Sequence, residues 1–121
     1  GIMGAWGNKP YMNDEGADWL DTALQPAADS IQQLLDAPVE QNLYDKYRAA
    51  GWLLTKICRV HVYPVNLIEP HLLTIHERLQ TVRGDASWMD CWLDNQMRNE
   101  MNDLICQIQR ICRWNNIDIK F

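Results

Sequence analysis

The sequence predicts a mostly α, single-domain bundle of about five helices, with an ordered N-terminal loop and a short extended C-terminal tail. Apolar residues recur at helical intervals over most of the chain, and residues that cap or end helices separate the periodic segments. The 121 residues, 47% hydrophobic and 22% charged, suit one domain with one core. We assign that domain to residues 3–121 and interpret Gly1 and Ile2, which precede Met3, as an expression scar.

The first 25 residues predict a loop followed by a helix. Gly4 and Gly7 give the backbone freedom around Trp6, so we expect an ordered loop over residues 3–12. Asn13 or Asp14 is expected to cap a first helix that runs to about residue 25. The positions that this helix is expected to bury are Trp19, Leu20, Ala23 and Leu24.

Two more helices are predicted before residue 60. Pro26 fits the first position of a short second helix, which Ala37 and Pro38 end. A third helical pattern extends from about residue 39 to about residue 60, with Gly51 near its middle. Because glycine costs about 1 kcal/mol relative to alanine inside a helix, we expect Gly51 to admit a bulky neighbour such as a tryptophan.

The rest of the chain predicts two helices and a tail. Asn66 begins the fourth helix, and Gly84 is expected to end it in the left-handed conformation. Ser87, with Asp90 three residues later, is expected to cap a long fifth helix whose apolar stripe extends to Ile111. Residues 115–121 alternate apolar and polar, and we favour an extended segment packed across the helices over an edge strand.

The four cysteines predict free thiols rather than disulfides. They form no Cys-x-x-Cys pair, and no secretion signal precedes them, so we expect all four to be buried as small hydrophobic residues in a cytoplasmic protein. No apolar run approaches the roughly 20 residues of a membrane helix, so no membrane partner is expected.

No residue set predicts catalysis, a metal or a cofactor. His71 and His76 are five residues apart, which turns their rings away from each other on a helix and does not suit a zinc site. Asp14 with Asp18, and Asp90 with Asp94, would each face the same way on a helix, as an acid and a base in catalysis could. They have no adjacent basic residue to orient them, and helical spacing makes such pairs common. We therefore expect a protein that is not an enzyme and that binds no metal and no cofactor.

The charges are distributed unevenly along the chain. Residues 1–45 contain eight acids and one base, whereas residues 46–121 contain eight acids and ten bases. An acidic segment of this kind disfavours direct nucleic-acid binding and favours a basic protein partner. A solvated acidic face that maintains solubility is the alternative.

Two regions combine acids with aromatic residues that an interface could use as anchors. A single core holds three or four of the six tryptophans, which leaves others for the surface. Alternatively, Trp88 and Trp92 roof the core beneath the N-terminal loop. The residues that we expect to contact a partner are Asp14, Glu15 and Asp21 in the first region and Trp88, Asp90, Trp92 and Asp94 in the second.

Residues 3–20 contain Met-Gly-Ala-Trp-Gly, an aromatic residue after Pro10, then Asn13-Asp14 and Asp18-Trp19. This pattern resembles the N-terminal signature of the domain of unknown function 4259 family. Lys9, Tyr11 and Gly16 stand where glycine, phenylalanine and alanine are common in that family. The resemblance covers about a seventh of the chain and implies a small helical bacterial protein without an established enzymatic activity. The family-like positions are Gly4, Ala5, Trp6, Gly7, Pro10, Asn13, Asp14, Ala17, Asp18 and Trp19.

The residue types in this signature predict a structural motif. We expect Asp18 to accept hydrogen bonds from loop N–H groups or from the Trp6 indole, with about 1.5–3 kcal/mol for a charge-assisted bond. The residues assigned to this motif are Gly4, Trp6, Gly7, Asn13, Asp18 and Trp19.

Together these features predict a small acidic binding protein, such as a bacterial immunity protein that neutralises a basic, nuclease-like toxin domain by direct binding. The alternatives are a hydrolase-like enzyme with a noncontiguous site and a structural or oligomerising helical module. An enzyme would gather its histidines and aspartates in a deep pocket, whereas an interface protein would present a flat acidic patch with exposed aromatic residues.

Overall fold

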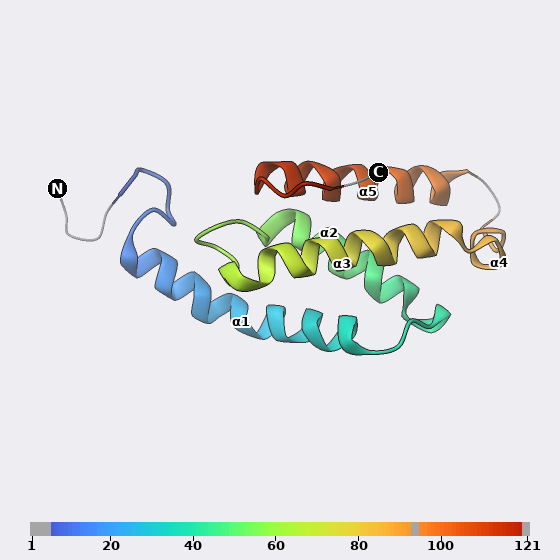
Figure 1. Cartoon of the computed structure of the whole chain (residues 1–121), viewed down its shortest axis with the longest axis horizontal. Coiled ribbons are helices and arrows are strands. Elements are labelled where there is room, and N and C mark those ends of the chain that lie inside the picture. The colour runs from blue at the N-terminus through green and yellow to red at the C-terminus, as the bar shows by residue number, and fades with distance from the viewer. Residues whose placement is uncertain (1–5, 93–94, 120–121) are drawn as a thin grey trace.

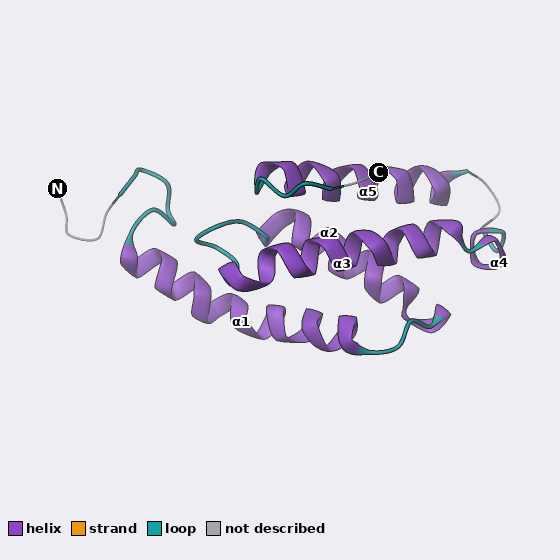
Figure 2. Ribbon diagram, in the orientation of Figure 1, coloured by secondary structure: helices purple, strands orange, loops and turns teal. Residues whose placement is uncertain are grey.

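Helices account for all the regular structure of residues 6–92 and 95–119, the part of the chain that the computed structural model describes (Figure 2). No strand occurs in these ranges, which confirms the prediction of a mostly α bundle. The elements are α1 (Asp14–Asp36), the 3-10 helix η1 (Gln41–Leu43), α2 (Tyr44–Ile57), α3 (Val65–Gly84), α4 (Ala86–Met89) and α5 (Gln96–Trp114).

Helix α3 is the centre of the bundle. It contacts α1, α2, α4 and α5, and Figure 1 shows it between α1 and α5. Its apolar stripe is completely enclosed because neighbours cover it on several sides. The fully buried residues of the core include Leu72, Ile75, Leu79 and Val82 of α3, Tyr47 and Leu54 of α2, and Met101 and Ile108 of α5.

Helix α1 is one continuous helix, so the predicted break at Pro26 is wrong. Pro26 lies inside it and cannot donate a backbone hydrogen bond to the carbonyl of Thr22. Both residues are exposed, so water can hydrate the carbonyl that remains free.

The N-terminal half of α1 extends beyond the bundle (Figure 1). Trp19 is 68% exposed, and the first fully buried residue of the helix is Ala28. The predicted buried face at residues 19–24 is therefore wrong: Leu20 and Leu24 are only half-buried, and the buried residues of α1 all follow Pro26.

Helix α2 begins later than predicted, after the 3-10 turn of η1, and ends at Ile57. Gly51 does admit a close neighbour, but that neighbour is a leucine rather than a tryptophan. A Cβ atom on Gly51 would lie 3.0 Å from Cδ1 of Leu79 on α3. The glycine thus lets α2 and α3 approach closely.

The boundary between the fourth and fifth predicted helices differs from the prediction. Gly84 is the last residue of α3 and does not adopt a left-handed conformation. Asp85, rather than Ser87, caps the next helix by accepting the Trp88 N–H. That helix, α4, is a single turn, and α5 begins separately at Gln96.

The tail from residue 115 to 119 packs across the helices, as predicted. Asn116 has a φ of 58°, the left-handed conformation that ends many helices, and the Ile117 N–H donates to the Cys112 carbonyl at 2.9 Å. Ile117 and Ile119 are buried. The Asn115 amide also donates to the Cys58 carbonyl at 2.9 Å, which ties the end of α5 to the end of α2.

The cysteines are free thiols, but only two are buried. Cys58 and Cys112 lie in the core, whereas Cys91 and Cys106 are exposed, so the prediction of four buried thiols is wrong for half of them. None of the helices within the described ranges is both long and apolar enough to span a membrane.

Candidate partner-binding surface on helix α1

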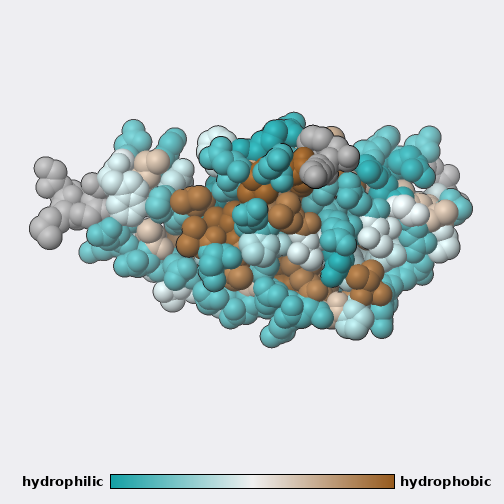
Figure 3. Space-filling view, viewed as in Figure 1, coloured by the Kyte–Doolittle hydropathy of each residue, from teal (hydrophilic) through white to brown (hydrophobic). Residues whose placement is uncertain are grey.

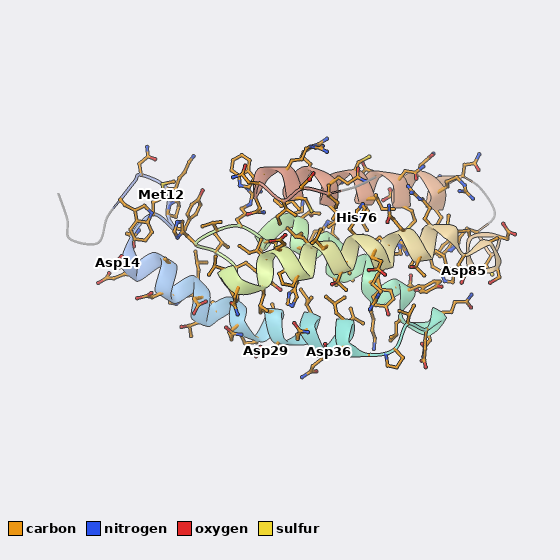
Figure 4. The ribbon with its side chains drawn as sticks, in the orientation of Figure 1. Met12, Asp14, Asp29, Asp36, His76 and Asp85 are labelled. Carbon is orange, nitrogen blue, oxygen red and sulfur yellow. The ribbon has the colours of Figure 1, made fainter. Side chains whose placement is uncertain are left out.

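Carboxylates line one side of α1 over nearly its whole length. The helix contains six acidic residues and neither lysine nor arginine. Because α1 does not break at Pro26, the acidic positions of its first half and those of its second half share one helix, as far as Asp36. Figure 4 labels Asp14, Asp29 and Asp36 along the helix. The positions that recur at intervals of three or four are Asp14, Asp18, Asp21, Gln25, Asp29, Gln32 and Asp36.

The two glutamines of this stripe support its carboxylates. The Gln25 amide donates to Asp29 at 2.9 Å, and the Gln32 amide donates to Asp36 at 2.8 Å. These are pairs four residues apart, which face each other on a helix. These bonds orient the carboxylates of Asp29 and Asp36.

Asp18 and Asp21 line a hollow of about 250 Å³ between α1 and the connector that joins α2 to α3 (residues 58–64). Neither carboxylate has a basic partner in the described part of the chain. The opposite wall is largely apolar, and Figure 3 shows an apolar area over this connector and the start of α3. The remaining lining residues are Ala17, Val60, His61, Val62, Tyr63 and Val65. We call this site the Asp18–Asp21 hollow.

The N-terminal loop contacts the same connector. The Trp6 ring lies 5.3 Å from the His61 ring, measured between centroids, and His61 has a left-handed φ of 70°. Such a φ is uncommon for a residue with a side chain. The conformation of His61 thus accompanies its contact with the loop.

Asn13, not Asp18, fastens the loop to α1. The Asn13 side chain accepts the Gly16 N–H at 2.7 Å and donates to the Pro10 carbonyl at 3.2 Å, which confirms the predicted cap. The Trp6 N–H donates to the Met12 carbonyl at 2.9 Å. No described group donates to the Asp18 carboxylate, so the predicted bond from the Trp6 indole is not formed.

Two glycines permit close packing in this loop. A Cβ atom on Gly16 would lie 2.5 Å from the Pro10 carbonyl oxygen, and one on Gly7 would overlap the Met12 sulfur. Gly4, the remaining glycine of the predicted motif, lies outside the described residues.

The first predicted contact region is exposed, and the second lies at the other end of the molecule. Asp14, Glu15 and Asp21 are exposed, as are Asp18 and Trp19 beside them. Figure 4 places Asp14 at one end of the bundle and Asp85, next to α4, at the opposite end. The structure therefore does not join the two regions into one surface.

The second region is an aromatic pair covered by a base. Trp88 is half-buried with its ring 5.6 Å from Tyr44, and the 43% exposed Trp92 packs against Trp88 at 5.7 Å. The Arg48 guanidinium lies 6.0 Å from each indole ring. Asp90 is exposed nearby in sequence. The predicted contact residue Asp94 lies outside the described residues.

This arrangement changes the interpretation of the tryptophan pair. Trp88 does pack against the core, but the N-terminal loop is at the far end of the bundle and does not cover it (Figure 1). Of the described tryptophans, none is fully buried. The expectation that the core holds three or four of them is therefore wrong.

Asp85 links η1, α2 and α4 through hydrogen bonds, and the sequence did not lead us to predict this role. It accepts hydrogen bonds from Ser87 Oγ at 2.7 Å, from Tyr44 Oη at 2.8 Å and from the Gln41 amide at 3.2 Å. These bonds hold the pKa of the Asp85 carboxyl well below its usual range. Burial, together with Asp85, raises the pKa of Tyr44 to about 12. An aspartate three residues before Trp88, directly after a helical segment, was the available signal.

The buried histidines do not form a shared site. His71 lies between the Tyr63 hydroxyl at 2.6 Å and the Gln32 amide oxygen at 2.7 Å, whereas His76 contacts the Gln109 amide at 3.1 Å. Figure 4 shows His76 inside the bundle, between α3 and α5. Among the described residues, no group of three potential ligands is close enough to hold a metal ion.

Comparison with known proteins adds no family to this description. No family model, no curated protein and no solved structure matches the chain.

Proposed function

We propose that this protein binds a basic protein partner through α1 and inhibits it. Its closest functional description is that of a bacterial immunity protein, which would act in the cytoplasm on a basic toxin domain of the nuclease type. The observation that carries the proposal is the Asp18–Asp21 hollow, where two carboxylates without a basic partner face an apolar wall on a helix that contains no base.

The hollow suits a lysine or arginine side chain of the partner. Such a side chain has an apolar stem, which can lie along Val60 and Val65, and a charged end, which can reach Asp18 and Asp21. Hydrogen bonds to charged groups contribute about 1.5–3 kcal/mol each. One inserted base would therefore account for a substantial part of the affinity.

Trp19 gives the same surface an aromatic anchor. It is 68% exposed on the part of α1 that extends beyond the bundle. Tryptophan is enriched among the residues that dominate interface energies. The acids around it would steer a basic partner, and Trp19 would slow its release.

The resemblance of residues 3–20 to the domain of unknown function 4259 family is consistent with this proposal. It supports a bacterial origin for the chain and is compatible with a binding role, since the family has no established enzymatic activity. It does not identify the partner.

A binding assay with the basic product of a neighbouring gene tests the proposal. We expect Asp18→Lys/Asp21→Lys to weaken binding at least about tenfold, which corresponds to about 1.4 kcal/mol. The matched control is Glu69→Lys/Glu77→Lys, which changes two exposed acids of α3 and alters the net charge equally. Trp19→Ala should also weaken binding, whereas Trp114→Ala, which changes another exposed tryptophan, should not.

Salt and protection provide further readouts. Binding should weaken from about 0.1 M to about 1 M NaCl, because the Debye length falls from about 10 Å to about 3 Å. Coexpression of the chain should suppress the toxicity of the partner, and the Asp18→Lys/Asp21→Lys variant should not. Equal loss of binding in the α3 control, or no binding to any adjacent gene product, would contradict the proposal.

A further inference from the structure

Helices α2 and α5 run parallel and side by side, and their outer faces form a continuous groove. Asp45 of α2 lines the same hollow as Glu100 of α5, and Arg59, two residues after the end of α2, lines the same hollow as Trp114 of α5. The two hollows adjoin, because Gln107 lines both. This outer groove belongs to neither α1 nor the Asp18–Asp21 hollow.

The groove is acidic at one end and basic at the other. The hollow between the N-terminal halves of the two helices, about 370 Å³, contains Asp45, Glu100 and Asp103. Arg48 lines it too and pairs with Asp45 at 2.9 Å, and among the described residues Glu100 and Asp103 have no basic partner.

The hollow between the C-terminal halves, about 310 Å³, contains Lys56, Arg59 and Arg110 and no acid. None of these three bases makes an ion pair with a described carboxylate, although the chain as a whole has a net charge of −5. Two of them instead lie over indole rings, with Lys56 5.7 Å from Trp52 and Arg59 5.6 Å from Trp114.

An exposed tryptophan marks the middle of the groove. Trp52 of α2 is 56% exposed and is equally far in sequence from Asp45 and Arg59. Gln107 is equally far from Glu100 and Trp114 on α5. Five of the groove residues of α5 recur at alternating intervals of three and four, the spacing of helix faces that pack against other helices: Glu100, Asp103, Gln107, Arg110 and Trp114.

We propose that this groove binds a second copy of the same chain, turned antiparallel about a two-fold axis near Trp52 and Gln107. A two-fold interface requires a surface that is complementary to itself. Rotation about this axis places the acidic end of each copy over the basic end of the other, so the charges are matched twice. The result is a four-helix arrangement with Trp52 of both copies at its centre, where interface anchors concentrate.

Charge-reversal variants test this pairing through the mass of the assembly in solution. One variant, Lys56→Glu/Arg110→Glu, replaces two bases with acids. The other, Glu100→Lys/Asp103→Lys, replaces two acids with bases, and all four positions are exposed. Light scattering of the wild type should show the mass rising from one chain to two with concentration. Each variant alone should remain at one chain, because like charges then face each other at both ends.

Mixing the two variants is the decisive measurement. In the mixed pair both contacts again join opposite charges, so the mass should return to two chains, one of each variant. Trp52→Ala should raise the dissociation constant of the wild-type dimer at least about tenfold. Circular dichroism confirms that each variant is folded.

Three outcomes would overturn the pairing: a wild type that stays at one chain, single variants that still dimerise, or a mixture that does not. The control Asp18→Lys/Asp21→Lys should dimerise like the wild type, because α1 is not part of the groove. That control also separates this inference from the proposed function, since it affects binding of a basic partner only.

Discussion

At the scale of single residues, the hydrogen bonds of His71 determine which ring nitrogen carries the proton. An amide oxygen only accepts, so the Gln32 contact requires a proton on Nε2 of His71. Nδ1 then accepts a hydrogen bond from the Tyr63 hydroxyl, so both nitrogens of the neutral ring have a partner. In His76, Nε2 accepts a hydrogen bond from the Gln109 amide and therefore carries no proton.

Stability should therefore fall as the solution becomes acidic. Burial lowers the pKa of His71 and His76 from the ordinary 6.5; Asp36 opposes this shift at His71, and Arg83 adds to it at His76. The unfolded chain then binds protons that the folded chain does not, so stability present above pH 6.5 is lost as the pH falls below it. Each histidine contributes up to about 1.4 kcal/mol per pH unit.

Urea unfolding at about pH 7.5 and about pH 5.5 measures this loss. His76→Gln should reduce the difference in the free energy of unfolding between the two pH values without abolishing it, because His71 remains. Asp85, whose pKa is lowered from 3.8, contributes a separate loss only below that pH. An equal free energy of unfolding at the two pH values would show that the buried rings do not titrate as expected.

At the scale of elements, the continuity of α1 determines the length of its acidic stripe. Pro26 was predicted to start a helix because proline is common at a first helical position. The same residue also fits inside a helix when the carbonyl four residues earlier is hydrated, as the exposed Thr22 allows. Local sequence does not distinguish the two cases, since both place proline in a helical conformation.

Pro26→Ala should accordingly stabilise the protein. An interior proline costs about 3 kcal/mol, and part of the gain is offset because alanine frees the unfolded chain, so we expect about 1–3 kcal/mol from urea unfolding. Pro38→Ala, in the segment after α1, provides the control and should not stabilise. A neutral or destabilising Pro26→Ala would instead support two separate helices.

Other elements differ in how well the sequence predicts them. The buried stripe of α5 was predictable because Met97, Met101, Ile105 and Ile108 follow helical spacing toward a single core. The start of that helix was not, because Ser87, its predicted cap, lies in the single turn of α4. Asp85 caps α4 and also contacts Tyr44 and Gln41, and α5 begins separately at Gln96.

At the scale of the whole molecule, burial divides the four cysteines into two classes. Cys58 and Cys112 are in the core, where burial raises the pKa of the Cys58 thiol to about 12 and that of the Cys112 thiol to about 11. Cys91 and Cys106 are exposed. Their sequence contexts do not separate the classes, because all four were predicted in apolar helical segments.

Alkylation with iodoacetamide should therefore modify Cys91 and Cys106 first. Mass spectrometry of the digested protein identifies the modified thiols, and all four should react in urea, where the core is open. Rapid modification of Cys58 or Cys112 in the folded protein would contradict this description of the core.

The sequence by itself determined the helical class, a capped helix start at Asn13 or Asp14, the acidity of α1 and the extended tail, because these depend on local spacing and side-chain chemistry. Only the tertiary structure decided where the tryptophans lie and which charges face each other. Exposure depends on which helices cover a side chain, and Trp19 and Trp52 are exposed because no helix packs over them. The Asp18–Asp21 hollow and the groove between α2 and α5 likewise arise from segments distant in sequence, which periodicity alone does not bring together.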